Sequence, residues 1–160
     1  MNLRVGSGFD VHRFEEGRDL FLGGILIDNH IGLAGHSDAD VLIHAIIDAL
    51  LGAAAIGDIG ELFPDTDSAF KNIRSTILLE KVVSELISRG WQIVNVDSTV
   101  VCETPKISKY KLQMRKKLAE IMRISLDCVM IKGKTTEKLG FTGRKEGIAA
   151  MSTALLEKKL

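Results

Sequence analysis

The stretch DADVLIHAIIDALLGAAA, residues 38–55, decides how this chain folds. Its apolar residues fall on almost every side of a helix with 3.6 residues per turn, which is typical of a helix buried at the centre of a domain. Ser37 precedes it in the position of an N-cap, and Asp40 takes the third helical position, as in a capping box. We therefore expect a central, buried helix that carries one histidine, His44, into the core.

The segments on either side show the patterns of further strands and helices. An alternating run predicts a strand over residues 3–13 that runs into a loop, and a stretch broken by two glycines predicts short strands or a hairpin over residues 19–27. A long, turn-rich and mostly irregular loop is expected after the central helix, and loops of that length are often functional. Amphipathic and alternating patterns then predict two helices, at residues 73–89 and 108–122, and two strands, at residues 91–102 and 127–132.

The last segment, residues 147–156, fits two structures. Its alanine, methionine and leucine favour a helix by propensity, whereas a short apolar run also suits a buried strand. The order of the core elements is β-α-β-α-β-β, which predicts an α+β fold (an α/β sandwich) with a mixed four-stranded sheet and helices packed on one face. No repeat or linker-like composition divides the chain, so we expect a single domain over residues 1–160.

Composition and charge exclude several classes of protein. The 160 residues are 46% hydrophobic and 26% charged, and 21 lysines and arginines balance 21 aspartates and glutamates. Without a basic excess there is no electrostatic reason to expect binding to nucleic acid or to an anionic membrane. The longest apolar stretch, Val41–Ile56, is too short to span a bilayer, and the N-terminus lacks a signal or transit pattern. The two cysteines form no disulfide framework, so a reducing cytoplasm is the expected setting.

Asp10, His12 and His44 are the candidate metal ligands. Asp10 and His12 are two residues apart, so on an extended segment their side chains point to the same face. Three nitrogen and oxygen ligands with an open fourth position are typical of a catalytic zinc site. Two alternatives stay open: His44 is a core histidine bonded to Asp40 or Asp48, or Asp48 fixes the tautomer of a metal-bound His44. Spacing alone does not show that residues 10–12 meet residue 44.

Two glycine-containing segments have the composition of phosphate sites. Residues 32–38 bring a turn onto a helix N-terminus, where free N–H groups and the helix dipole favour anions. The alternative is that Ser37 only caps the helix and His36 is solvated. Residues 135–144 combine hydroxyls, a carboxylate and cations, which suit a divalent ion and oxyanions, although an exposed hairpin loop has the same composition.

Several long motifs, read in order along the chain, resemble one enzyme family. They are Gly8–Phe14 (GFDVHRF), Gly35–Asp40 (GHSDAD), His44 with Asp48–Ala54 (DALLGAA), Gly57–Gly60 (GDIG), Phe63–Asp67 (FPDTD) and Thr135–Arg144 (TTEKLGFTGR). Over nearly its whole length the chain is similar to the 2-C-methyl-D-erythritol 2,4-cyclodiphosphate synthases. The resemblance implies a catalytic domain in a bacterial cytoplasm, a homotrimer with active sites between subunits, and a role in non-mevalonate isoprenoid biosynthesis.

The resemblance also implies a reaction. The substrate would be 4-diphosphocytidyl-2-C-methyl-D-erythritol 2-phosphate, whose 2-phosphate attacks the β-phosphorus and closes a cyclic diphosphate with release of CMP. Asp10, His12 and His44 would hold one zinc ion per active site, and Glu137 would help to hold Mg²⁺ or Mn²⁺ across the α- and β-phosphates. Because phosphoryl transfer needs mainly alignment and charge neutralisation, two cations meet its demands and no strong general base has to be found.

Catalytic and substrate-binding residues carry over by position. His36 and Thr135 would support the transition state. The residues expected to touch the substrate are Asp10, Val11, His12, His36, Ser37, Asp58, Ile59, Gly60, Phe63, Pro64, Asp65, Thr66, Asp67, Cys102, Glu103, Thr104, Pro105, Lys106, Ile107, Ser108, Lys134, Thr135, Thr136, Glu137, Phe141 and Arg144. Asp58 and the Phe63–Asp67 loop would hold the methylerythritol part, and residues 102–108 would line the cytidine pocket that a neighbouring subunit contributes. Phe9 and Arg144 would face a central cavity that binds isoprenoid diphosphates in the family.

A few positions depart from the family's pattern. Arg74 stands where an aspartate usually precedes Ser75, so that helix start is expected to be capped differently. Lys134 and Glu103 replace neutral residues, and Lys109 replaces a frequent proline. Two other functions remain as alternatives: a metal-dependent phosphohydrolase with water as the nucleophile, and a non-enzymatic trimer that senses isoprenoid diphosphates.

Overall fold

Five strands form the main sheet of the computed structural model, which describes residues 2–159. In order across the sheet they are β4 (Gly32–Leu33), β1 (Leu3–Glu15), β7 (Gly147–Lys158), β5 (Trp91–Val101) and β6 (Val129–Lys134). The β5–β6 pair is parallel and the other three pairs are antiparallel, so the sheet is mixed. The predicted α+β class is confirmed. The predicted count of four strands is wrong, because the two-residue strand β4 extends the edge beside β1.

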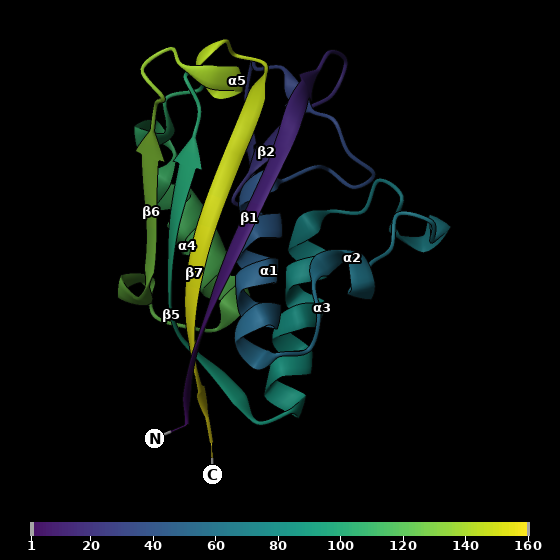
Figure 1. Cartoon of the computed structure of the whole chain (residues 1–160), viewed down its shortest axis with the longest axis vertical. Coiled ribbons are helices and arrows are strands. Elements are labelled where there is room, and N and C mark those ends of the chain that lie inside the picture. The colour runs from purple at the N-terminus through teal and green to yellow at the C-terminus, as the bar shows by residue number, and fades with distance from the viewer. Residues whose placement is uncertain (1, 160) are drawn as a thin grey trace.

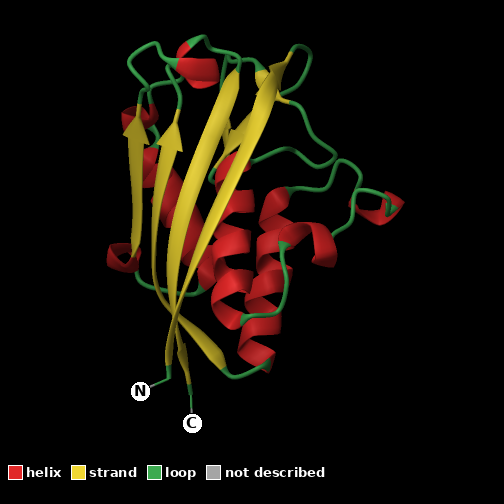
Figure 2. Ribbon diagram, in the orientation of Figure 1, coloured by secondary structure: helices red, strands yellow, loops and turns green. Residues whose placement is uncertain are grey.

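Three long helices cover one face of this sheet, as predicted: α1 (Val41–Ala54), α3 (Ser75–Ser88) and α4 (Lys111–Met122) (Figures 1 and 2). Nearly every residue of α1 is buried, because this helix contacts β1 and β7 on one side and α3 on another. The connections carry a separate hairpin of β2 (Leu20–Leu22) and β3 (Ile25–Ile27), the short helices α2 (Ile59–Leu62) and α5 (Gly140–Gly143), and 3-10 turns at Ser68–Phe70, Ile107–Lys109 and Leu126–Cys128. Within residues 2–159 no helix is both long and apolar enough to cross a membrane.

Two glycines let α1 lie directly against β1. A Cβ atom at Gly6 would lie 2.0 Å from the carbonyl oxygen of Ala49, and one at Gly8 would lie 2.0 Å from that of Ala45. No real side chain fits at such distances, so the bare backbone of the strand is what allows the helix to approach. This contact fixes the position of α1 over the strand that carries two of the candidate ligands.

The strand β1 is longer than predicted. It continues to Glu15 instead of turning into a loop near residue 13. Because side chains alternate along a strand, the even-numbered residues of β1 face α1 and the odd-numbered residues face the open side of the sheet. Asp10 and His12 are therefore held on a regular strand, on the face that α1 covers.

The first turn of α1 differs from the prediction at its N-cap. The N-cap is Asp40 rather than Ser37, and its Oδ1 accepts hydrogen bonds from the backbone N–H groups of Ile43 and Gly23, each at 3.0 Å. The Oδ2 atom accepts a third from the N–H group of Gly24, at 2.7 Å. One carboxylate thus caps the helix and ties it to the β2–β3 hairpin.

The last segment is a strand, which decides between the two structures that its sequence allowed. β7 lies between β1 and β5, and Met151 is paired with Phe9 on one side and with Thr99 on the other. Its even-numbered residues, from Ile148 to Leu156, are buried on the helix side. In this central position both edges of the strand are hydrogen-bonded, so pairing outweighs the helix propensity of its alanines and leucines.

Candidate metal centre

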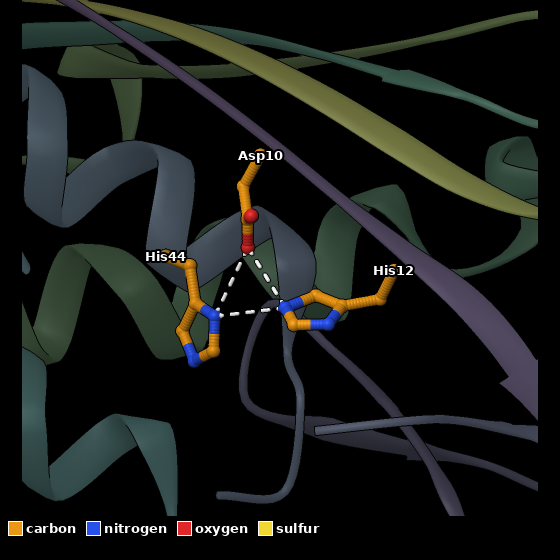
Figure 3. Close-up of side chains that lie close together, drawn as sticks. All are labelled: Asp10, His12 and His44. Carbon is orange, nitrogen blue, oxygen red and sulfur yellow. Dashed lines mark hydrogen bonds and ion pairs between the residues drawn. The ribbon is translucent and has the colours of Figure 1, made fainter. Parts of the chain in front are cut away.

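Asp10, His12 and His44 converge on one point between β1 and α1 (Figure 3). The Oδ2 atom of Asp10 lies 2.9 Å from Nε2 of His12 and 3.0 Å from Nδ1 of His44, and these two nitrogens are 3.2 Å apart. Ligands bound tetrahedrally at about 2.0–2.1 Å from zinc lie roughly 3.3 Å from one another. The cluster needs to open by only a few tenths of an ångström to match such a site, and its two imidazoles and one carboxylate are ligands that zinc prefers.

The elements explain why these three side chains meet. Asp10 and His12 share the helix-facing side of β1, and His44 lies in the first turns of α1, directly above that side of the strand. The helix can come this close because the strand carries glycine at position 8, next to the ligand pair. The structure thus supplies the juxtaposition that the spacing in the sequence left open.

The ring of His44 bonds to neither Asp40 nor Asp48, the two aspartates considered as its partners from sequence. Asp40 caps α1, and Asp48 instead accepts a hydrogen bond on Oδ1 from the N–H group of Ile59, at 2.8 Å. The Nε2 atom of His44 lies 2.9 Å from Oγ of Ser75, and Ser37 Oγ is at 3.1 Å. Both alternatives built on Asp40 or Asp48 are therefore wrong.

The charges of the cluster favour an ionised carboxylate between two imidazoles. Burial by itself would raise the pKa of Asp10, but hydrogen bonds from His12 and His44 outweigh it and hold that pKa well below its usual range. The pKa of His12 is shifted in the opposite direction, upward. Burial would lower this pKa, but the hydrogen bond to Asp10 and the charge of Asp10 raise it. A metal cation bound at this point would stabilise the ionised carboxylate of Asp10 in place of the hydrogen bonds from the imidazoles.

The cluster opens into a cavity of about 360 Å³. Many predicted site residues line it: Asp10, His12, His36, Ser37, His44, Ile59, Gly60, Phe63, Pro64 and Asp65. Phe70, Ile73 and Leu78 also line it, although no pattern around them indicates a site. Phe70 packs edge-on against Phe63 with their ring centres 5.3 Å apart, so an apolar wall stands opposite the polar ligands.

Three residues between positions 58 and 67 that were predicted to touch the substrate do not line the cavity: Asp58, Thr66 and Asp67. Asp58 is the N-cap of α2, where Oδ1 accepts from the N–H group of Glu61 at 2.9 Å. Asp67 caps the turn Ser68–Phe70 in the same way, and Thr66 lies exposed between them. The carboxylates of Asp58 and Asp67 thus cap two short helical segments within this loop.

The turn at residues 35–37 is held from outside the cavity. Arg18 donates from Nη1 to the carbonyl oxygen of Gly35, at 2.7 Å, and from Nη2 to that of Ser37, at 2.5 Å. The carbonyl oxygen of His36, between them, accepts from the N–H group of Asn72 at 2.8 Å. Arg18 was not selected from sequence, because nothing local links it to a turn seventeen residues away.

The other predicted site residues form a second group, beyond the carboxyl ends of β5 and β6. In Figure 1 the segments that follow these two strands lie at the upper edge of the sheet, around α5. Glu103 joins them, since its Oε1 accepts from the N–H groups of Thr136 (3.3 Å) and Lys138 (3.2 Å). Thr135 donates from Oγ1 to Oε1 of Glu137 at 2.6 Å. The residues of this second group are Cys102, Glu103, Thr104, Pro105, Lys106, Ile107, Ser108, Lys134, Thr135, Thr136, Glu137, Phe141 and Arg144.

None of the second group lines the metal cavity of the same chain. Arg144 is exposed and paired with Glu146 at 2.7 Å. Phe9 and Val11, the sequence neighbours of Asp10, are on the open side of the sheet, opposite to the candidate ligands. One chain therefore presents two separate halves of the predicted site.

Comparisons with known proteins agree on the family of this chain. A family model described as the YgbB family matches residues 3–157. A 2-C-methyl-D-erythritol 2,4-cyclodiphosphate synthase of Bacteroides fragilis is 54% identical over 158 residues, which are 99% of each chain.

Solved structures show the same fold. A bifunctional IspDF from Campylobacter jejuni superposes with a TM-score of 0.94 at 44% identity, and the match covers 98% of this chain and 42% of that one. An IspF from Plasmodium falciparum, solved as a CDP complex, superposes with a TM-score of 0.86 at 34% identity, covering 99% and 98%. The chain belongs to the YgbB family, together with relatives that are 2-C-methyl-D-erythritol 2,4-cyclodiphosphate synthases.

Proposed function

We propose that this protein converts 4-diphosphocytidyl-2-C-methyl-D-erythritol 2-phosphate to 2-C-methyl-D-erythritol 2,4-cyclodiphosphate and CMP. The observation that carries the proposal is the convergence of Asp10, His12 and His44 on one point of a cavity whose rim includes His36 and Ser37. Two nitrogens and one carboxylate oxygen with room for a further ligand suit zinc, which would polarise the phosphate that is attacked.

The residues of the chain have the remaining tasks. The turn at His36 and Ser37 would hold the diphosphate beside the ligands, with its carbonyl groups already bonded to Arg18 and Asn72. Ile59, Gly60 and the Phe63–Asp67 segment would enclose the methylerythritol part. His36 and Thr135 would stabilise charge on the equatorial oxygens, and Glu137 would hold Mg²⁺ or Mn²⁺ against the α- and β-phosphates.

We infer that the active form is a homotrimer that completes each site between two subunits. Support comes from the separation of the two groups of site residues within one chain. It also comes from the open side of the sheet, where Val5 is 68% exposed, Phe9 58% and Met151 50%. Apolar side chains gathered on one face indicate a protein partner, and a second copy would bring its nucleotide loop, residues 102–108, toward this cavity.

Two further parts of the proposal concern ligands and setting. The cytidine would bind to residues 102–108, and the CDP complex of the Plasmodium falciparum relative supports a nucleotide ligand of this kind. Phe9 and Arg144 would face a central cavity of the trimer that accepts an isoprenoid diphosphate. We place the protein, as a single catalytic domain of 160 residues, in the bacterial cytoplasm.

Phosphorus NMR of the reaction with the diphosphocytidyl substrate tests this function. The cyclic diphosphate and CMP should accumulate in equal amounts, and the His44→Ala protein should lose both zinc and turnover. A ring-opened bisphosphate as the product would instead identify a phosphohydrolase. Binding of isoprenoid diphosphate without any turnover would identify a sensor, in which His44→Ala leaves binding intact.

A further inference from the structure

The two nitrogens of the His44 ring face different surroundings. Nδ1 points to Asp10 and His12, whereas Nε2 points away from the cluster to Oγ of Ser75, at 2.9 Å, and to Oγ of Ser37, at 3.1 Å. A neutral imidazole carries its proton on one nitrogen, and which one is set by the hydrogen bond made by the other side of the ring. For Nδ1 to offer a free electron pair to a metal, Nε2 must carry the proton and donate it in a hydrogen bond.

Ser75 is arranged to receive that hydrogen bond. Its side chain is fully buried at the first position of α3, and its hydroxyl donates to Oδ1 of Asp38. A hydroxyl has a single proton, so once it donates to Asp38 its lone pairs are what it offers to His44. Nε2 of His44 then donates to the hydroxyl of Ser75, and this hydroxyl donates to Asp38.

Asp38 is held as an acceptor by groups on two sides. Its Oδ2 accepts from the N–H group of Ser75 at 3.1 Å and from Nε of Arg74 at 2.9 Å. The guanidinium of Arg74 lies 3.8 Å from the ring centre of Phe21, so it is itself fixed in place. The same carboxylate supplies the missing cap of α3, whose N-cap residue Arg74 makes no side-chain capping bond. This explains how the helix begins with an arginine where the family usually has an aspartate.

We propose that Ser75 and Asp38 are positioning residues that fix the tautomer and the ring orientation of His44, so that Nδ1 is presented unprotonated to a divalent metal. Arg74 supports them by holding Asp38. The proposal rests on the metal binding proposed above. Partners of this kind orient a ligand without touching the ion, and their loss typically lowers metal affinity about 10–100-fold.

Zinc affinity of the full-length protein, measured by competition with a chromophoric chelator, tests the proposal without any assay of turnover. Ser75→Ala should bind zinc about 10–100-fold more weakly than the wild type. Ser75→Thr, which keeps the hydroxyl, should recover most of that loss. The matched control is Ser84→Ala on the same helix, where an exposed hydroxyl donates to the carbonyl oxygen of Glu80; its affinity should be unchanged.

Nitrogen NMR of the metal-free protein labelled in histidine gives a second readout that a merely structural role would not move. Wild-type His44 should carry a proton on Nε2, as the donor to Ser75, and Ser75→Ala should lower the share of rings protonated there. Wild-type protein that binds zinc although the metal-free His44 ring is unprotonated at Nε2 would overturn the proposal, as would unchanged affinity in Ser75→Ala. Wild-type protein that binds no zinc would instead overturn the proposed function. The wild-type spectrum decides the matter even if the alanine variant fails to fold.

Discussion

Single atoms decide how closely β1 and α1 approach. At Gly8 a methyl group would meet the carbonyl oxygen of Ala45 at 2.0 Å and the N atom of Ala49 at 2.7 Å, both of which are backbone atoms that cannot rotate away. At Gly52, on the same helix, the nearest atom to such a methyl group is the carbonyl oxygen of Ser7, at 4.0 Å. Alanine should therefore have opposite effects on stability at Gly8 and at Gly52.

Gly8→Ala should cost about 3 kcal/mol of the free energy of unfolding or more, because helix and strand must move apart. Gly52→Ala should stabilise the protein by about 0.5–1 kcal/mol, since alanine favours the helix and meets no obstacle. Urea unfolding of both variants provides the measurement. Equal effects of the two substitutions would contradict the close approach.

A buried thiol in the loop of residues 102–108 has a strongly shifted pKa. The side chain of Cys102 is buried, and this burial, together with the charge of Glu103, raises its pKa to about 12. The thiolate is the reactive form of cysteine, so folding keeps Cys102 in the unreactive form through the whole physiological range. Cys128 is only partly buried.

At pH 8 the folded protein should therefore react with iodoacetamide at Cys128 and leave Cys102 unmodified, as read by peptide mass spectrometry. Unfolding in urea should expose both cysteines to the reagent. Because the pKa of Cys102 is raised, its reactivity in the native state should increase only as the pH approaches 12. Rapid native modification of Cys102 at pH 8 would show that this loop opens.

At the scale of elements, the N-terminal end of α1 depends on partners that are remote in sequence. The apolar pattern of residues 38–55 predicted the helix, but its cap is set by the hairpin glycines that donate to Asp40. β7 was ambiguous for the same reason, because its neighbours β1 and β5 decide its conformation. Asp10, His12 and His44 could be selected as candidate ligands from residue type and spacing, but their convergence could not, because it depends on the contact between α1 and β1. The roles of Ser75, Asp38 and Arg18 were not predictable, since they come from contacts between distant segments.

Asp40→Ala should destabilise the protein by roughly 2–4 kcal/mol, because it removes a helix cap and leaves without acceptors the buried N–H group of Gly23 and the half-buried one of Gly24. Thermal unfolding followed by circular dichroism measures this loss. The matched control is Asp67→Ala, where an exposed carboxylate caps only the short turn Ser68–Phe70 and the expected change is within about 1 kcal/mol. A loss no larger than that of the control would show that the hairpin contact contributes nothing.

At the scale of the whole molecule, the sheet has one face under helices and one face open. The open face carries Val5, Phe9, Val11, Met130 and Met151, each more than a third exposed. It also carries the ion pair of Lys132 and Asp97, at 2.6 Å. The proposed assembly would cover this face, and the fold of one chain gives no other means of covering it.

Val5→Glu places a charge on this apolar face and should shift the protein from trimer to monomer, since a carboxylate without a partner is costly to bury. Sedimentation equilibrium gives the mass, and turnover should fall together with it. Zinc affinity should persist, because the ligands lie on the other side of the sheet. The matched control is Ile87→Glu, which also replaces an exposed apolar side chain with a carboxylate, at a 48% exposed position of α3. It should leave the mass unaltered. A trimer that survives Val5→Glu would place the interface elsewhere.

The antiparallel pairing of β1 with β7 has a consequence for how this unit joins other units. Leu3 pairs with Glu157, so the beginning of the first strand and the end of the last lie side by side, at the opposite end of the sheet from α5 (Figure 1). Polypeptide attached at either place would leave the molecule at one pole, far from the loops that are proposed to bind nucleotide. The fold is therefore suited to serve as one domain of a longer multidomain chain. In the Campylobacter jejuni relative the matched region is 42% of a bifunctional chain.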